Sequence, residues 1–187
     1  MGAAAGWIAA EGMDRGRMLE ALDLVEAPDA PRPKASLCTL PNGWSILFTV
    51  DFGFPTPERM GLMSADGAAI AVSADERSMV SVVRGYERGQ AVFAIEHDGG
   101  SQGVRHMQTA GELPAEWTAV LERANRDQDE EDQGAADVDH LFDAPMALAE
   151  ALCGYRHDRP WPEGQEQTMT LLVERKRPGL LGRLFGL

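Results

Sequence analysis

Cysteine, long apolar runs and basic side chains are all scarce in this chain. Its two cysteines, Cys38 and Cys153, lie far apart and lack C-x-x-C spacing, so the sequence predicts neither a disulfide framework nor a thiolate zinc site. No stretch approaches the roughly 20 apolar residues of a membrane span. The first residues, MGAAAGWIAAEGMDRG, lack the basic start of a signal peptide. We therefore expect a cytoplasmic protein without a transmembrane segment.

The shortage of positive charge argues against nucleic acid as a partner. The chain has 17 basic and 30 acidic side chains and a formal net charge of -13, which repels phosphate backbones. The sequence also contains no G-x-G-x-x-G turn, Walker A loop, G-x-S-x-G elbow or H-E-x-x-H helix. We therefore predict no nucleic-acid binding and no cofactor.

Length and composition predict one soluble domain. The chain has 187 residues, of which 44% are hydrophobic and 25% are charged, as expected for a globular protein that buries a core without disulfides. We predict a single domain over residues 1–174, followed by a distinct tail at 175–187. In general appearance the chain resembles small, acidic bacterial proteins, and this resemblance carries no activity.

The first half of the chain predicts strands and short helices in alternation. Residues 6–10 are apolar and predict a strand, and Met18, Leu19, Leu22 and Val25 recur at helical spacing. Three prolines make residues 27–36 a surface connector. The run WSILFTV at 44–50 is rich in aromatic and β-branched residues and predicts the central strand. A short helix should begin at Pro57, capped by Thr56.

The second half predicts a meander and then two helices. Four β runs between residues 68 and 109 are separated by short polar turns. A helix should begin at Pro114, with Trp117, Val120, Leu121 and Ala124 as its apolar stripe. A second should run from Asp143 to Gly154, and residues 168–174 predict a last strand. Together these elements predict an α+β fold, a mainly antiparallel sheet with helices packed on one face.

Negative charge is concentrated in residues 127–139, DQDEEDQGAADVD, which carry seven acids. This segment has too little apolar surface to pack, and we predict an exposed acidic loop. Such a loop attracts basic partners over a distance. The candidate contact residues are Asp129, Glu130, Glu131 and Asp132.

A second candidate contact surface is the loop at 155–162, which contains Tyr155, Arg156 and Trp161. Aromatic and arginine side chains are enriched where proteins contact one another. Trp161 stands between two prolines, which favours an exposed position.

Two histidines fall near a glycine-rich break in residues 94–109, AIEHDGGSQGVRHMQT. If this stretch is a hairpin, one register places His97 opposite Val104 and another places it opposite His106. Both keep the two imidazoles on the same face of the sheet. Either register also sets an acid beside Arg105, which is an ordinary cross-strand ion pair.

The closer register would present two imidazoles to one metal ion. With His157 or Asp158 as a third ligand, His97 and His106 would form a small transition-metal site. This is the basis for an alternative function, a metal-dependent hydrolase built on a His/Asp cluster.

The tail RKRPGLLGRLFGL at 175–187 combines basic residues with leucines and a phenylalanine at helical spacing. It predicts a short basic amphipathic segment. Such a segment rests on an anionic membrane, docks in a groove of a partner or packs on its own protein.

These observations favour a non-enzymatic module that binds a protein partner. We predict that a basic partner surface contacts the acidic loop and the aromatic loop. An adaptor and an immunity protein both work by such complementarity. The metal-dependent hydrolase remains the alternative.

Overall fold

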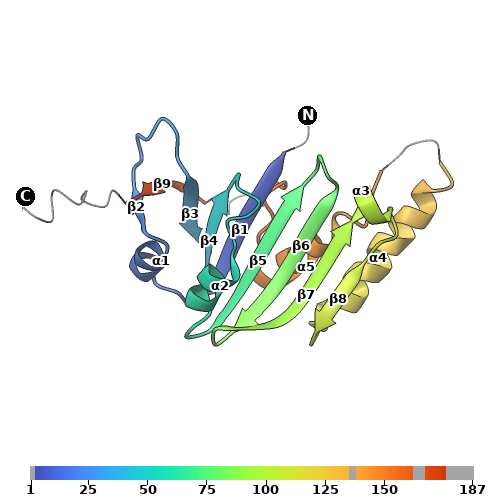
Figure 1. The fold of residues 1–187 in the computed structure, drawn as a ribbon, viewed down its shortest axis with the longest axis horizontal. Coiled ribbons are helices and arrows are strands. Elements are labelled where there is room, and N and C mark those ends of the chain that lie inside the picture. Colours follow the sequence, from blue (N-terminus) through green and yellow to red (C-terminus); the bar gives the residue numbers. More distant parts are fainter. Residues whose placement is uncertain (1–2, 135–137, 162–166, 176–187) are drawn as a thin grey trace, which may run out of the picture.

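The computed structural model describes residues 3–134, 138–161 and 167–175. Within them nine strands form one antiparallel sheet in the order β2-β9-β3-β4-β1-β5-β6-β7-β8 (Figure 1). The strands are β1 (Ala4–Glu11), β2 (Leu24–Glu26), β3 (Ala35–Thr39), β4 (Trp44–Thr49), β5 (Ala68–Asp75), β6 (Val80–Glu87), β7 (Gln90–Asp98), β8 (Gln108–Gly111) and β9 (Thr170–Glu174). The helices are α1 (Arg15–Ala21), α2 (Pro57–Met63), α3 (Gly99–Gln102), α4 (Glu116–Glu131) and α5 (Ala144–Cys153). The predicted α+β class with an antiparallel sheet is confirmed.

The middle of the sheet is β1, not β4 as predicted. β1 lies between β4 and β5, and both Trp7 and Ile8 are fully buried although they point to opposite faces. β4 is its neighbour. The apolar run at 44–50 predicted burial correctly for most of β4, although Val50 lies outside the strand and is exposed. Burial alone does not give a strand's position in the sheet.

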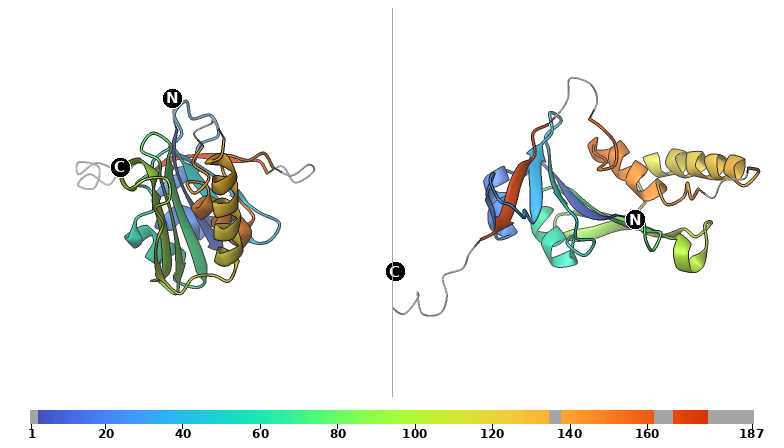
Figure 2. Two further views of the ribbon diagram at one scale, coloured as in Figure 1. Left: turned by 90° about the vertical axis from the view of Figure 1, so that its right-hand side faces the viewer. Right: turned by 90° about the horizontal axis from the view of Figure 1, so that it is seen from above.

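Helices cover both faces of the sheet and not one face as predicted. α5 lies against β5, β6 and β7, and α4 packs chiefly against α5. The shorter α1 and α2 lie on the opposite face (Figure 2). Trp7 belongs to the core under α4 and α5, whereas Ile8 belongs to the core under α1 and α2. Among the helices of the described residues, none is long and apolar enough to cross a membrane.

The N-terminal elements follow the sequence prediction with one correction. α2 begins at Pro57, and the side chain of Thr56 accepts a hydrogen bond from the backbone of Arg59. The first helix is shorter than predicted, because the chain turns at Asp23, which has a φ of 56°. Val25 therefore lies in the edge strand β2, not on the helix.

Two strands on this side of the sheet depend on partners distant in sequence. β3 begins at Ala35, so the end of the predicted connector at 27–36 is a strand. β9 lies within the predicted strand 168–174 and inserts between β2 and β3.

The meander is confirmed for β5 to β8, but the connection and the register of its last hairpin differ from the prediction. The helix α3 follows β7, and β8 begins only at Gln108, which lies opposite Glu96. Both predicted registers are therefore wrong, because residues 104–107 belong to the connection and not to a strand. Since the acid Asp98 caps α3 by accepting from the backbone of Ser101, the glycine-rich break forms a helical turn instead of a tight hairpin.

The first part of the predicted acidic loop is helical. α4 begins at Glu116 and continues to Glu131, with Asp132 at its C-cap, so the prediction of a loop is wrong for residues 127–131. Residues 135–137 lie outside the described part of the chain, as does the tail from residue 176. α5 ends as predicted, with Gly154 in the left-handed conformation at a φ of 80°.

Candidate binding groove

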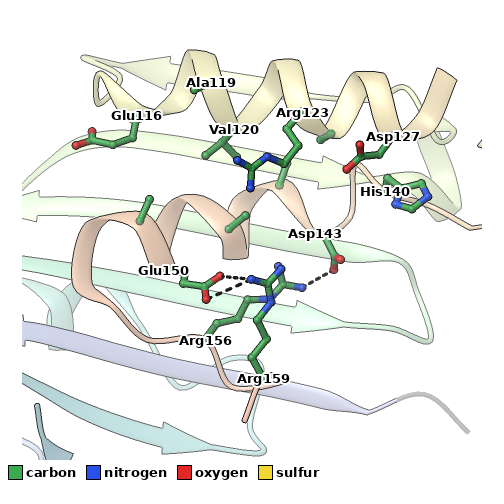
Figure 3. Close-up of a pocket in the computed structure, with 14 residues that line it drawn as sticks. Glu116, Ala119, Val120, Arg123, Asp127, His140, Asp143, Glu150, Arg156 and Arg159 are labelled. Carbon is green, nitrogen blue, oxygen red and sulfur yellow. Dashed lines mark hydrogen bonds and ion pairs between the residues drawn. The ribbon is translucent and has the colours of Figure 1, made fainter. Parts of the chain in front are cut away.

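A groove with a cavity volume of about 500 Å³ lies between α4 and α5 (Figure 3). Small side chains from both helices create it, because alanines leave space where larger residues would close the contact between the helices. The apolar lining consists of Ala119, Val120, Ala124, Ala144, Ala147 and Ala151. On α5 the alanines recur three and four residues apart, so they share one face of the helix.

The α4 side of the groove carries three charged side chains at helical spacing, Glu116, Arg123 and Asp127. None of the three side chains makes a hydrogen bond or an ion pair within the part of the chain that the structure describes. Glu116 lies in the first turn of α4, where a negative charge is favourable. Asp127 lies three turns further along, towards the helix end that disfavours negative charge. The α4 wall therefore offers two unpaired carboxylates, with an unpaired guanidinium between them.

The α5 side of the groove is held by paired charges. Asp143 and Glu150 form ion pairs with Arg156 and Arg159, at 2.8 and 3.1 Å (Figure 3). Because these charges already have partners, the α5 wall is stiffer and closer to neutral than the α4 wall.

Arg156 is a buried residue that stabilises this wall through its ion pairs. Its side chain is only 3% exposed, and its guanidinium donates to both carboxylate oxygens of Asp158, at 2.6 and 2.7 Å. Burial acts to raise the pKa of Asp158, but the hydrogen bond and charge of Arg156 prevail and lower it. Burial likewise acts to lower the pKa of Arg156, and its two carboxylate partners raise it instead. The pair thus stays charged and fixes the loop that follows α5.

The C-terminal end of α4 holds the predicted acidic contact residues. Asp129 and Asp132 both form ion pairs with Arg105. Hydrogen bonds from Gln128 and Arg105 lower the pKa of Asp132. Glu130 is exposed. The fourth, Glu131, is half-buried and lies 3.6 Å from the Nε2 of a nearby histidine, His140.

His97 is not on the surface of a hairpin but fully buried. Its Nδ1 lies 2.8 Å from the carbonyl oxygen of His106, and its Nε2 lies 2.9 Å from Oδ2 of Asp139. Both ring nitrogens are therefore engaged. The Nδ1 of His106 accepts a hydrogen bond from the backbone N–H of Asp98 at 2.8 Å, so the neutral ring carries its hydrogen on Nε2. In this arrangement neither ring presents a free lone pair to a metal ion.

The other two residues of the metal hypothesis lie elsewhere. His157 stacks on Phe48 at a centroid distance of 5.9 Å, and Asp158 pairs with Arg156. Burial lowers the pKa of His157. Across residues 3–134, 138–161 and 167–175, no three His, Cys, Asp or Glu side chains are grouped so as to hold a metal ion. The geometry thus gives the hydrolase alternative no support.

The predicted aromatic contact surface is mostly internal. Tyr155 is 7% exposed and packs edge-on against Trp7 at 5.1 Å. Trp161 is half-buried and lies 5.4 Å from the ring of Tyr155. Tyr155 and Arg156 therefore have little surface to offer a partner, and the predicted contact rests on Trp161.

The groove itself was not predicted, although the sequence contains a signal for it. Glu116, Arg123 and Asp127 recur seven and four residues apart, which places them on one helical face. The alanines of α5 follow the same rule. Small residues on one side of each of two helices predict a groove only if the two helices are known to pack side by side. Which helices are neighbours depends on the whole fold and not on either segment alone.

The chain was also compared with known proteins. Comparison with protein-family models, with curated proteins and with solved structures gave no match.

Proposed function

We propose that this chain is a non-enzymatic, cytosolic protein-binding module whose partner presents a basic segment. The segment would lie in the groove between α4 and α5, with its cations towards α4. The observation that carries the proposal is a pair of carboxylates, Glu116 and Asp127, on the wall of an alanine-lined groove, which have no partner among the residues that the structure describes. An apolar groove bordered by charge is a common way to bind a helical or extended segment. Adaptors and immunity proteins both use such complementarity.

The charge of α4 supports a basic occupant. Residues 116–132 contain seven acids and two bases, and the last turn of α4 has no basic residue. Acids at a helix C-terminus oppose the helix dipole and cost about 0.3–1 kcal/mol each. Arg105 offsets this cost for Asp129 and Asp132, but not for Glu130. A bound cation would offset the electrostatic repulsion between these acidic side chains and the C-terminal end of the helix dipole.

The environment of the reactive side chains favours binding over catalysis. His97 has no free nitrogen and no exposed surface. Burial raises the pKa of the Cys38 thiol to about 11 and that of the Cys153 thiol to about 12. Thiols with such pKa values are poor nucleophiles at neutral pH.

A designed peptide tests the proposal directly. The probe is a labelled helical peptide of alanine and leucine flanked by arginines, and its matched counterpart has glutamates in place of the arginines. We expect the arginine peptide to bind in a fluorescence anisotropy titration and the glutamate peptide not to bind. Binding should weaken as salt is added, because the contacts are exposed ion pairs.

Variants then locate the contact. Glu116→Gln/Asp127→Asn should weaken binding by about 2- to 30-fold, on the basis of about 0.2–1 kcal/mol per exposed ion pair. The control is Glu58→Gln/Asp29→Asn, which removes one acid from the first turn of α2 and one from a loop. Equal binding of the arginine peptide to both double variants would contradict the proposal, as would equal binding of the two peptides to the parent.

A further inference from the structure

The occupant of the groove can be specified further from the chain's own sequence. Residues 176–187 contain Lys176, Arg177 and Arg183 and no acid. Between the two arginines lies the uncharged run PGLLG. The segment is thus a basic element in a protein with a net charge of -13, and it has the apolar residues that an alanine-lined groove can bury.

The charge pattern of this segment matches the α4 wall of the groove. Glu116 and Asp127 are eleven residues apart on a helix, which separates them by about 16 Å. Arg177 and Arg183 are six residues apart, a span of about 9 Å in a helix and about 20 Å in an extended chain. Their long side chains add reach at both ends. The α4 wall has a carboxylate at each end, with small apolar side chains and Arg123 between them, and the segment has arginines on both sides of an uncharged run.

Arg123 fits the same alignment. It lies between the two carboxylates on the α4 wall (Figure 3), where a cation of the occupant would be repelled. In the alignment above, the uncharged run between the two arginines lies opposite this guanidinium. A generic polybasic segment, with a cation at every position, would fit less well.

The segment cannot place both of its arginines in the groove of its own molecule. It follows β9, which is second in the sheet, whereas the nearest strand under α5 is β5, four strand spacings or about 19 Å away. The groove lies between α5 and α4, and α4 lies further from β9 than α5 does (Figure 1). The two residues from Arg175 to Arg177 span at most about 7 Å even when fully extended. Arg177 therefore cannot lie in the groove of the same chain, and the alignment that uses both arginines requires the groove of another copy.

We infer that residues 176–187 of one copy bind in the groove between α4 and α5 of a second copy. This inference rests on the proposed function, because it names the basic segment that the groove takes. Reciprocal exchange of the segment closes a two-fold dimer, and one-way binding links copies head to tail. In both cases the partner copy supplies the residues that fill the site.

Sedimentation velocity of the full chain over a range of concentrations tests the inference. We expect species heavier than the 20.3 kDa of one copy, which revert to the monomer in the full-length variant Leu181→Asp/Leu184→Asp. Ala151→Arg, which puts a cation in the groove, should also give the monomer. The control Ala110→Arg changes an exposed alanine of β8 and should associate like the parent.

A peptide of residues 175–187 separates this inference from the proposed function. We expect the labelled peptide to bind the Leu181→Asp/Leu184→Asp variant, and Ala151→Arg in that background to weaken binding about ten-fold. A monomeric parent at all concentrations, with no binding of this peptide, would overturn the inference. If the designed arginine peptide still binds in that case, the proposed function stands. If the 175–187 peptide binds only phosphatidylglycerol vesicles and not the protein, the segment is a membrane anchor and the inference is wrong.

Discussion

Removing the carboxylate of Asp139 should destabilise the fold strongly, because it leaves Nε2 of a buried imidazole without a partner. The carbonyl oxygen of His106 can only accept, so Nδ1 of His97 carries a hydrogen. A proton must then also lie between Nε2 and the carboxylate, at their separation of 2.9 Å. The other carboxylate oxygen accepts the backbone N–H of Phe142 at 3.0 Å. Asp139→Ala breaks both contacts at once.

The magnitude follows from burial. His97 is 0% exposed and the side chain of Asp139 is 8% exposed, and deleting one partner of a buried pair costs about 3–5 kcal/mol. For a chain of this length, 1 kcal/mol lowers the melting temperature by about 2–4 °C. Thermal unfolding followed by circular dichroism should therefore show a fall of about 6–20 °C. The control Asp66→Ala removes the partner of Arg17 in an exposed ion pair and should cost less than about 1 kcal/mol.

The substitution Asp139→Asn separates the contribution of the hydrogen bonds to stability from the contribution of the carboxylate charge. The asparagine oxygen can still accept from Phe142, and its amide can donate to Nε2 of a neutral His97. We expect most of the stability to return relative to Asp139→Ala. Nitrogen-15 spectra should show His97 of this variant as the neutral ring with its hydrogen on Nδ1.

Two results would refute this reasoning. One is a melting temperature for Asp139→Ala within about 2 °C of the parent, which is less than 1 kcal/mol. The other is a His97 ring in Asp139→Asn whose hydrogen lies on Nε2, because Nδ1 would then face a carbonyl oxygen without a hydrogen between them.

Three further predictions concern other parts of the fold. Arg156 lowers the pKa of Asp158, so the stability that this pair contributes is present above the unfolded pKa of about 3.9 and is lost as pH falls through the lower folded pKa. The difference in unfolding free energy between the parent and Asp158→Asn should therefore stay constant from pH 7 to about pH 5. A fall in this difference within that window would contradict the prediction. Burial raises the pKa of the thiols of Cys38 and Cys153, so Ellman's reagent at pH 8 should react with them only after denaturant is added. Rapid reaction with the native protein would contradict the burial of these two thiols. At Gly85 an added Cβ would lie 2.0 Å from the ring of the paired phenylalanine on β7, so Gly85→Ala should cost about 1–3 kcal/mol in urea unfolding, and an unchanged midpoint would refute the close contact.

Local sequence rules predicted much of the fold. The cap at Thr56, the end of α5 at Gly154 and the apolar strands of the meander depend on residues close together in the chain. The position of β9 between β2 and β3 could not be predicted in this way, because it depends on pairing between segments more than 100 residues apart. β2 has only three residues, too few for a periodic pattern.

The errors at the candidate site have a physical cause as well. The acidic run from residue 127 was expected to be a loop, since it has little apolar surface, yet ion pairs from Arg105 and the packing of Gln128 continue the helix to Glu131. The histidines were placed by an assumed hairpin, and the helical turn α3 changed that register. The groove exists because α4 and α5 pack side by side, and this packing cannot be predicted from the sequence of either helix alone.

The central claim is that the space between α4 and α5 binds a basic segment. The most direct measurement is an amide NMR titration of the Leu181→Asp/Leu184→Asp variant with the designed arginine peptide. The account predicts saturable shifts in residues 116–127 of α4 and 144–151 of α5, and only small shifts in α1 and α2 on the opposite face of the sheet. The absence of shifts, or shifts concentrated on α1 and α2, would contradict it.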